Sequence, residues 1–185
     1  MKQKFLPLLL ASLLVAAASC GGEKKQEGSA DSTVTAQKKG PLEAKPEEQR
    51  SFPVALAGSK YDVSVHRRPD ASLPKVKDEL GQEFLDNSVE VVVTKDGAQF
   101  FSKTFTKDAF ADYLTKDENA RCVLLGMVYD EEHSSASTIC LAAQVGIPDV
   151  EDGPAFTIEI KTADGSCSIV RDVNADTTKE DSMGD

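Results

Sequence analysis

From residue 61 onward, apolar and polar residues mostly alternate along the chain. A period of two is typical of half-buried β-strands, because successive side chains of a strand point to opposite faces of the sheet. This pattern predicts seven strands, at 61–66, 89–94, 99–105, 122–129, 138–145, 156–160 and 167–170. The runs 122–129 and 138–145 are apolar on both faces, so we expect them to be central strands.

Turn residues separate several of these strands. Asp96-Gly97 stands between the runs 89–94 and 99–105, and Asp164-Gly165 stands between the last two runs. Asp-Gly favours a tight hairpin, because glycine readily adopts the positive φ that such a turn requires. A further hairpin, centred near Glu131, is expected between the two central strands.

Helical spacing interrupts the strand pattern in the stretch 106–114. Phe110, Tyr113 and Leu114 stand at positions i, i+3 and i+4, and Thr106 is placed to cap the start of a helix. One short helix is therefore expected between the third and fourth predicted strands.

The stretch 76–85 fits neither pattern clearly. Its apolar residues suit a helix face, but Gly81 interrupts that face, so no element is assigned to it. The strands and turns together predict a mainly β fold, either an antiparallel β-sandwich or a partly open barrel of about seven strands with one short helix.

The first nineteen residues have the layout of an export signal. Lys2 and Lys4 precede an apolar run of fourteen residues, 5–18, which is shorter than the ~20 helical residues that cross a bilayer. The run leads into Ala17-Ala18-Ser19-Cys20, which resembles the lipobox of bacterial lipoproteins. That resemblance implies cleavage before Cys20 and attachment of lipid to its sulfur. An ordinary signal peptide with a small-residue cleavage site is the alternative.

Composition divides the chain into four parts. Residues 1–19 are expected to be a lipoprotein signal peptide. Residues 20–50 are expected to be the lipidated cysteine and a flexible tether, because they are rich in Gly, Ser, Lys, Glu and Gln and have almost no large apolar side chain. Residues 51–173 are expected to form one β-rich domain, and residues 174–185 an acidic disordered tail.

The charge balance disfavours some partners. The chain has 21 Lys and Arg against 31 Asp and Glu, a net charge of −10. Such a surface repels nucleic-acid phosphates and anionic lipid headgroups. The expected partners are therefore a membrane, reached through lipid on Cys20, and an unknown protein or glycan, with no nucleic acid.

Beyond Cys20 the chain has three cysteines, Cys122, Cys140 and Cys167. No Cys-x-x-Cys spacing is present, so neither a zinc ribbon nor a thioredoxin-like motif is indicated. A hairpin centred near Glu131 would bring Cys122 opposite Cys140, where a disulfide could form. The alternative is three buried reduced thiols, since free cysteine is among the most buried residue types.

Two histidines are the main candidates for a chemical site. His66 stands beside Arg67 and Arg68 on the polar side of a predicted strand, where a solvated basic patch is expected. His133 follows three acidic residues, 130–132, in the predicted turn. Hydrated turn side chains are favoured there over a metal site, which needs several ligands in fixed geometry.

Other motifs add little chemistry. The loop with Asp149, Glu151 and Asp152 is a candidate calcium site, but it lacks the alternating ligands and closing Glu of a calcium loop. No Gly-x-Ser-x-Gly occurs. Cys122 and His133 could approach each other across a hairpin, although a buried thiol is a poor nucleophile. No catalytic residue, cofactor or metal ligand is therefore expected.

Several segments resemble a known family: 103–110 with Tyr113-Leu114, 126–130, 146–149, and 164–166 with Ser168-Ile169. On these segments the chain resembles the uncharacterised Bacteroides-type lipoproteins, the domain of unknown function 4738, from about Tyr61 to Asp172. The resemblance implies a location and a fold. It implies no activity and no binding residues, because its motifs are turn and core patterns.

These observations favour an outer-membrane-anchored lipoprotein of the cell envelope that acts as a non-enzymatic binding or accessory module. Two alternatives are an envelope hydrolase or thiol enzyme whose site is assembled only in the fold, and an inhibitor that inserts a loop into another enzyme.

Overall fold

The computed structural model of the protein describes residues 40–150 and 152–173. The predicted signal peptide, Cys20, the tether as far as residue 39, Glu151 and the predicted acidic tail all lie outside the described residues. Within the described ranges, no helix is long and apolar enough to span a bilayer.

The described residues form ten strands and two short helices. The strands are β1 (Leu42–Glu43), β2 (Glu48–Leu56), β3 (Ser59–Asp70), β4 (Val76–Lys77), β5 (Glu83–Lys95), β6 (Ala98–Phe105), β7 (Val123–Ser135), β8 (Thr138–Gly146), β9 (Ala155–Lys161) and β10 (Cys167–Asp172). The helices are the 3₁₀-helix η1 (Lys107–Tyr113) and the α-helix α1 (Lys116–Arg121).

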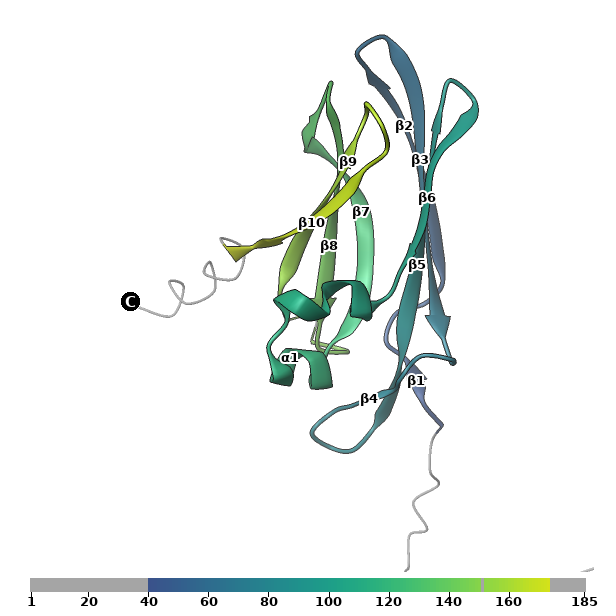
Figure 1. Cartoon of the computed structure of the whole chain (residues 1–185). Coiled ribbons are helices and arrows are strands. Elements are labelled where there is room, and N and C mark those ends of the chain that lie inside the picture. The colour runs from purple at the N-terminus through teal and green to yellow at the C-terminus, as the bar shows by residue number, and fades with distance from the viewer. Residues whose placement is uncertain (1–39, 151, 174–185) are drawn as a thin grey trace, which may run out of the picture. The chain divides into compact units, whose positions relative to one another are not determined.

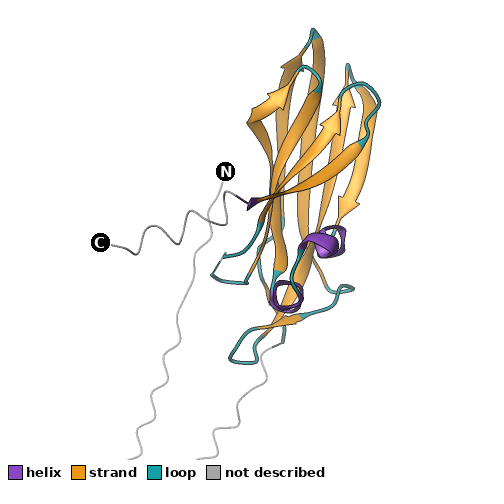
Figure 2. Ribbon diagram, turned by 60° about the vertical axis from the view of Figure 1, so that its left-hand side comes forward, coloured by secondary structure: helices purple, strands orange, loops and turns teal. Residues whose placement is uncertain are grey.

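The strands make two sheets that face each other (Figure 1). The first sheet has the order β1-β5-β3-β2, with β4 and β6 also paired to β5, and the second has the order β10-β9-β8-β7. All pairs are antiparallel except β1 with β5. The two short helices lie at one end of the sheets (Figure 2). This is a β-sandwich, so the predicted fold class is confirmed.

Alternating residues of both sheets fill the space between them. On β3, Tyr61, Val63 and Val65 are buried as their spacing predicts. The second sheet contributes central residues of β8 and β9, and both sheets are joined in one apolar cluster. Its fully buried side chains include Val63, Val89, Val91, Val93, Phe105, Leu124, Ile139, Leu141, Val145, Ile158 and Ile160. Removing this apolar surface from water is the main favourable term in folding.

The hairpin predicted at Asp96-Gly97 joins β5 to β6. Asp96 and Gly97 have φ of 49° and 86°, the pair of positive values that suits a two-residue turn between twisted strands. The Asp96 carboxylate also accepts a hydrogen bond from the backbone N–H of Lys60, at 2.9 Å. This bond ties the turn to the neighbouring β2–β3 hairpin.

The hairpin between β7 and β8 differs from the prediction. Its turn lies at residues 136–137, beyond Ser135, and not near Glu131. The acidic residues that suggested a turn lie on the exposed end of β7, where the register is irregular between Asp130 and Ser135. Polar side chains were therefore a poor guide to the turn, because this end of the strand extends into solvent.

Two further differences concern the first sheet. The expected domain boundary at residue 51 falls inside β2, an edge strand whose polar first half conceals its strand character. The unassigned stretch 76–85 contains β4 and the start of β5. Gly81, with a φ of 80°, allows the tight turn between them.

The helical region also differs in detail. Helix η1 covers the predicted stretch, but the Thr106 side chain makes no cap hydrogen bond. The second helix, α1, was not predicted. Its start is a capping box, in which the Thr115 side chain accepts from the Glu118 N–H and the Glu118 carboxylate accepts from the Thr115 N–H. That Thr-x-x-Glu signal was present in the sequence and was missed.

A buried polar contact joins η1 to both sheets. Lys107 Nζ donates to the backbone oxygens of Asn119 and Cys122, each at 2.8 Å, and lies 3.7 Å from the Asp86 carboxylate. Asp86 Oδ1 accepts from the N–H of Leu124 at 2.8 Å. Burial nevertheless raises the pKa of Asp86 above its ordinary value, against the opposing effect of these donors and of Lys107.

We predict that Lys107→Met lowers the free energy of unfolding at pH 7 by about 3–5 kcal/mol, because it leaves the Asp86 charge buried without its partner. Since the folded-state pKa of Asp86 is raised, the loss should shrink as the pH falls toward that pKa and the carboxyl becomes neutral. Urea unfolding across this pH range measures it. Lys116→Met, at an exposed position of α1, is the control and should change stability little.

Candidate functional site

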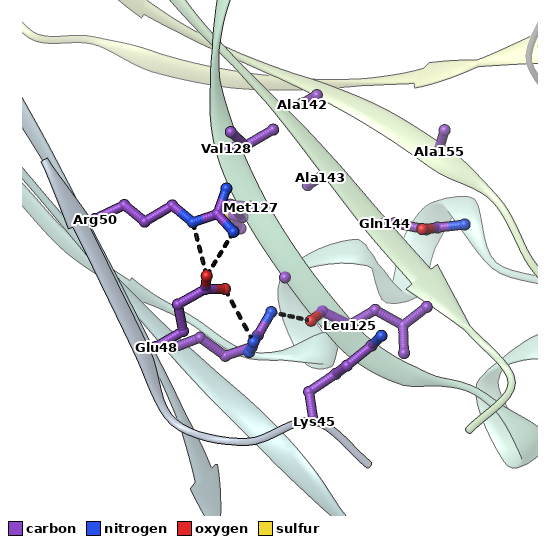
Figure 3. A pocket seen from close by; sticks show the side chains of 12 residues that line it. Lys45, Glu48, Arg50, Leu125, Met127, Val128, Ala142, Ala143, Gln144 and Ala155 are labelled. Atoms are coloured by element: carbon purple, nitrogen blue, oxygen red, sulfur yellow. Dashed lines mark hydrogen bonds and ion pairs between the residues drawn. The ribbon is translucent and has the colours of Figure 1, made fainter. Parts of the chain in front are cut away.

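A surface hollow of about 480 Å³ lies beside the edges of β2 and β7, where the two sheets are open to solvent (Figure 3). We call it the edge groove. Its lining residues are Lys45, Glu48, Arg50, Arg67, Leu125, Gly126, Met127, Val128, Ala142, Ala143, Gln144 and Ala155. The first four come from the side of the first sheet, and the others come from β7, β8 and β9 of the second.

Arg67 is the central side chain of the edge groove. It continues the alternation of Tyr61, Val63 and Val65 on β3, so its side chain points toward the second sheet and is only 14% exposed. Its guanidinium donates to the backbone oxygen of Leu125 at 3.1 Å and to the backbone oxygen of Pro46 at 3.1 Å. Arg67 thereby connects the two sheets at the floor of the groove.

The backbone of β7 is shaped to accept this guanidinium. The β7–β8 register shifts between Leu124 and Gly126, so Leu125 is an extra residue in the strand. Gly126 has a φ of 157°, and a Cβ there would lie 2.8 Å from Arg67 Nη1. The bulge therefore presents the Leu125 oxygen to Arg67, and glycine leaves room for the arginine.

Glu48 lies between Arg50 and Arg67 at the rim, and Figure 3 shows its carboxylate facing Arg50. Its carboxylate accepts from Arg50 Nε at 2.7 Å and from Arg67 Nη2 at 3.1 Å. The hydrogen bond from Arg50, together with the charges of both arginines, holds the pKa of Glu48 below its usual value. One carboxylate thus faces two guanidinium groups, which leaves this part of the rim with an excess of positive charge.

Small and apolar side chains make the second wall of the groove. Gly126, Ala142, Ala143 and Ala155 have little or no side chain, which creates the hollow beside the edge of β7. Met127 adds a flexible apolar surface that can adapt to different contacts. The groove therefore combines a cationic rim with an apolar wall, a combination common in binding sites.

A second hollow, of about 380 Å³, lies further along the same two strands. Residues 52–56 of β2 line one side, and Tyr129, Glu131 and Ser134 of β7 line the other. The rings of Phe52 and Tyr129, with centroids 5.8 Å apart, also come from these two strands. The open side of the sandwich thus offers an elongated surface along β2 and β7.

The histidines predicted as candidates lie apart from the edge groove lining. His66 Nε2 lies 2.7 Å from a Glu47 carboxylate oxygen, and the His133 ring lies 2.8 Å from Asp130 Oδ2. The expected solvated basic patch at His66 was wrong for Arg67, whose side chain is mostly buried and donates to Pro46, Leu125 and Glu48. Its place in the alternation with Val65 was the signal that could have revealed this.

The three cysteines in the described part of the chain, Cys122, Cys140 and Cys167, are free thiols. The strand register that suggested a disulfide between Cys122 and Cys140 was wrong. Cys140 pairs with Asp130, whereas Cys122 precedes β7 at its other end. The same geometry separates Cys122 from His133 by eleven residues of strand, roughly 35 Å. Burial raises the pKa of all three thiols, so the reactive thiolate form is disfavoured.

The predicted acidic loop is shaped by its backbone. The Ile147 N–H donates to the backbone oxygen of Asp152 at 2.7 Å. A Cβ added at Gly153 would lie only 2.3 Å from the backbone oxygen of Val145, so this loop position requires glycine. Glu151 lies outside the described residues. Among the side chains that the structure does describe, no group of three or more His, Cys, Asp and Glu is placed to hold a metal ion.

Comparison with known proteins identifies one family. A family model with the description "Domain of unknown function (DUF4738)" matches residues 28–169. This range includes all strands from β1 to β9, and with them every residue that lines the edge groove. No curated protein matches the chain.

We predict that Gly126→Ala lowers the free energy of unfolding by about 1–3 kcal/mol, because it strains the backbone and displaces Arg67 from the Leu125 oxygen. Chemical denaturation measures the loss. Gly58→Ala is the matched control, since Gly58 also has a positive φ, 82°, but nothing lies within 4 Å of its added Cβ. An equal loss in both variants would mean that contact with Arg67 is unimportant.

A second prediction concerns His133, whose pKa is raised above 6.5 by its hydrogen bond to Asp130 and then by the Asp130 charge. Proton NMR titration of the His133 ring should show this elevation. Asp130→Asn should return the pKa toward 6.5, and Glu132→Gln should lower it less. Because the folded-state pKa is raised, any stability from this pair is complete below pH 6.5 and disappears as the pH rises through the folded-state value.

Proposed function

The chain belongs to the family described as the domain of unknown function DUF4738, and from that premise we propose that it is a lipid-anchored binding module of the cell envelope. The proposal gives it no catalytic role. Its partner is an extended, acidic segment of another protein, which binds in the edge groove.

The anchoring part of the proposal is supported by the first twenty residues. A cationic start, an apolar run and Ala17-Ala18-Ser19-Cys20 have the order of a bacterial lipoprotein signal. Two or more acyl chains on one residue would hold the protein firmly at a membrane, since one chain alone gives only marginal binding. The outer membrane of a Bacteroides-type envelope is the proposed location.

The single observation that carries the binding role is the chemistry of the edge groove. Arg50 and Arg67 both donate there to the single carboxylate of Glu48, although the whole chain has a net charge of −10. A local excess of positive charge on an acidic protein favours a carboxylate-bearing partner, because complementary charge steers association and repels wrong partners.

The length of the open side favours an extended peptide. The β7 residues that line the two hollows run from Leu125 to Ser134, roughly 30 Å of strand. Pro53 lies in β2, the edge strand, and cannot donate a backbone hydrogen bond. Recognition along β2 is therefore expected to depend on side chains, with continuous strand addition interrupted at Pro53.

The test uses the chain from residue 20 onward, with Cys20→Ser, and a fluorescent ten-residue peptide of alternating Glu and Val. Arg50→Glu should weaken binding, measured by fluorescence anisotropy at low salt, about tenfold. Lys60→Glu makes the same charge change at an exposed position of β3 outside the groove lining, and it should have little effect.

Two controls separate this proposal from others. A peptide of alternating Lys and Val should not bind, and a polyuronate tests whether a glycan is preferred. Equal weakening by both charge reversals, or binding of the polyuronate without the acidic peptide, would contradict recognition of an acidic protein segment in the edge groove.

A further inference from the structure

Two apolar side chains are unusually exposed at one end of the sandwich. Leu80, between β4 and β5, is 94% exposed, and Val150, between β8 and β9, is 67% exposed. Both line one hollow of about 270 Å³, so they lie close together. We call this pair and the flanking Lys77, Asp149 and Arg121 the apolar tip.

Leu80 is presented by an ordered turn. The Asp78 carboxylate accepts from the backbone N–H groups of Leu80 and Gln82, at 2.9 Å and 2.8 Å. The Asp78 N–H in turn donates to the Gln82 oxygen at 3.1 Å. These bonds fix the turn, yet turn positions ordinarily carry polar residues or glycine. Local structure therefore gives no reason for a leucine here.

Val150 is presented in a comparable way. The preceding residue, Asp149, has a φ of 66°, which is uncommon for a residue with a side chain. The Val150 N–H donates to the Pro148 oxygen at 2.8 Å. The backbone is thus held in a conformation that directs a valine outward, and a strained backbone often marks a functional segment.

The described chain begins beside this apolar tip. The Gln82 amide donates to the Gly40 oxygen at 3.4 Å, and β1 pairs with Phe84 and Leu85 at the start of β5. Cys20 precedes Gly40 by twenty residues. Twenty residues span at most about 70 Å however they are arranged, so this end of the domain is the one tethered to any membrane that holds Cys20.

We propose that the apolar tip contacts the lipid bilayer, with Leu80 and Val150 inserted among the headgroups. This inference rests on the proposed lipidation of Cys20. The expected surface is zwitterionic, because Asp78, Glu79 and Asp149 would repel anionic lipid. Arg121 lies 2.8 Å from Glu79, so part of this acidic charge is already neutralised.

Tethering is essential to the proposed contact. Two apolar side chains bind a bilayer weakly, but attachment at Cys20 makes the second contact intramolecular, which raises its effective concentration. The domain without lipid should therefore stay in solution, whereas the lipidated protein should place its apolar tip in the membrane.

The absence of tryptophan from the chain allows a direct test. Leu80→Trp and Val150→Trp each introduce a single fluorophore into the lipidated full-length protein in phosphatidylcholine vesicles. We expect a blue-shifted emission and at least about a threefold lower acrylamide quenching constant than for the same variants carrying Cys20→Ser without lipid. Ala136→Trp, in the exposed β7–β8 turn, is the matched control and should show no change.

Equal quenching of the Leu80→Trp and Ala136→Trp proteins on vesicles would overturn the proposal. A blue shift in the lipid-free protein that grows with protein concentration would also overturn it, in favour of contact with a second copy. Mass spectrometry of Cys20 separates the two proposals. If Cys20 carries no lipid, anchoring fails, and the apolar tip is tested in the same variants tethered by an N-terminal hexahistidine to vesicles with nickel-chelating lipid.

Discussion

The structure depends on β5, the strand through which both sheets are connected. It pairs with β1, β3, β4 and β6, so the whole first sheet is built around it. Its inward residues Val89, Val91 and Val93 are fully buried against the second sheet. At its start, the Asp86 carboxylate and the Asn87 amide form hydrogen bonds with both backbone groups of Leu124 in β7, each at 2.8 Å. Apolar packing and these bonds together set the relative position of the sheets.

This arrangement also explains why one side of the sandwich is open. Because β2 and β7 are the last strands of their sheets on that side, their outer edges have no neighbouring strand among the described residues. Arg67 donates across this opening to the backbone oxygen of Leu125. This hydrogen bond closes the floor of the edge groove, whereas the rim of the groove stays accessible. A cation that helps hold the sheets together therefore also supplies charge to the edge groove. The proposed binding role depends on this position of Arg67, which contacts both sheets and also lines the edge groove.

The sequence predicted the parts of the fold that depend on local chemistry. The alternation of Tyr61, Val63 and Val65 identified β3, and Asp96-Gly97 identified the β5–β6 turn, because pleating and positive φ act within a few residues. It missed β2, since an edge strand can be polar on much of its surface. It misplaced the β7–β8 turn, because the acidic residues near Glu131 resemble a loop whether they extend a strand or end it.

By itself, the sequence determined a mainly β domain, the central strand β8 and the tight turns at Asp96-Gly97 and Asp164-Gly165, because each follows from side-chain periodicity or from glycine's backbone freedom. The expectation that the run 122–129 is also a central strand was wrong, because β7 is the last strand of its sheet and Val128 lines the open edge groove. Only the tertiary structure decided that Arg67 donates to the Leu125 oxygen, that Cys140 lies opposite Asp130, and that Leu80 and Val150 share one end of the sandwich. These relations join residues far apart in the chain. They depend on strand register and sheet packing, which are set by the burial of the whole core and have no local signature.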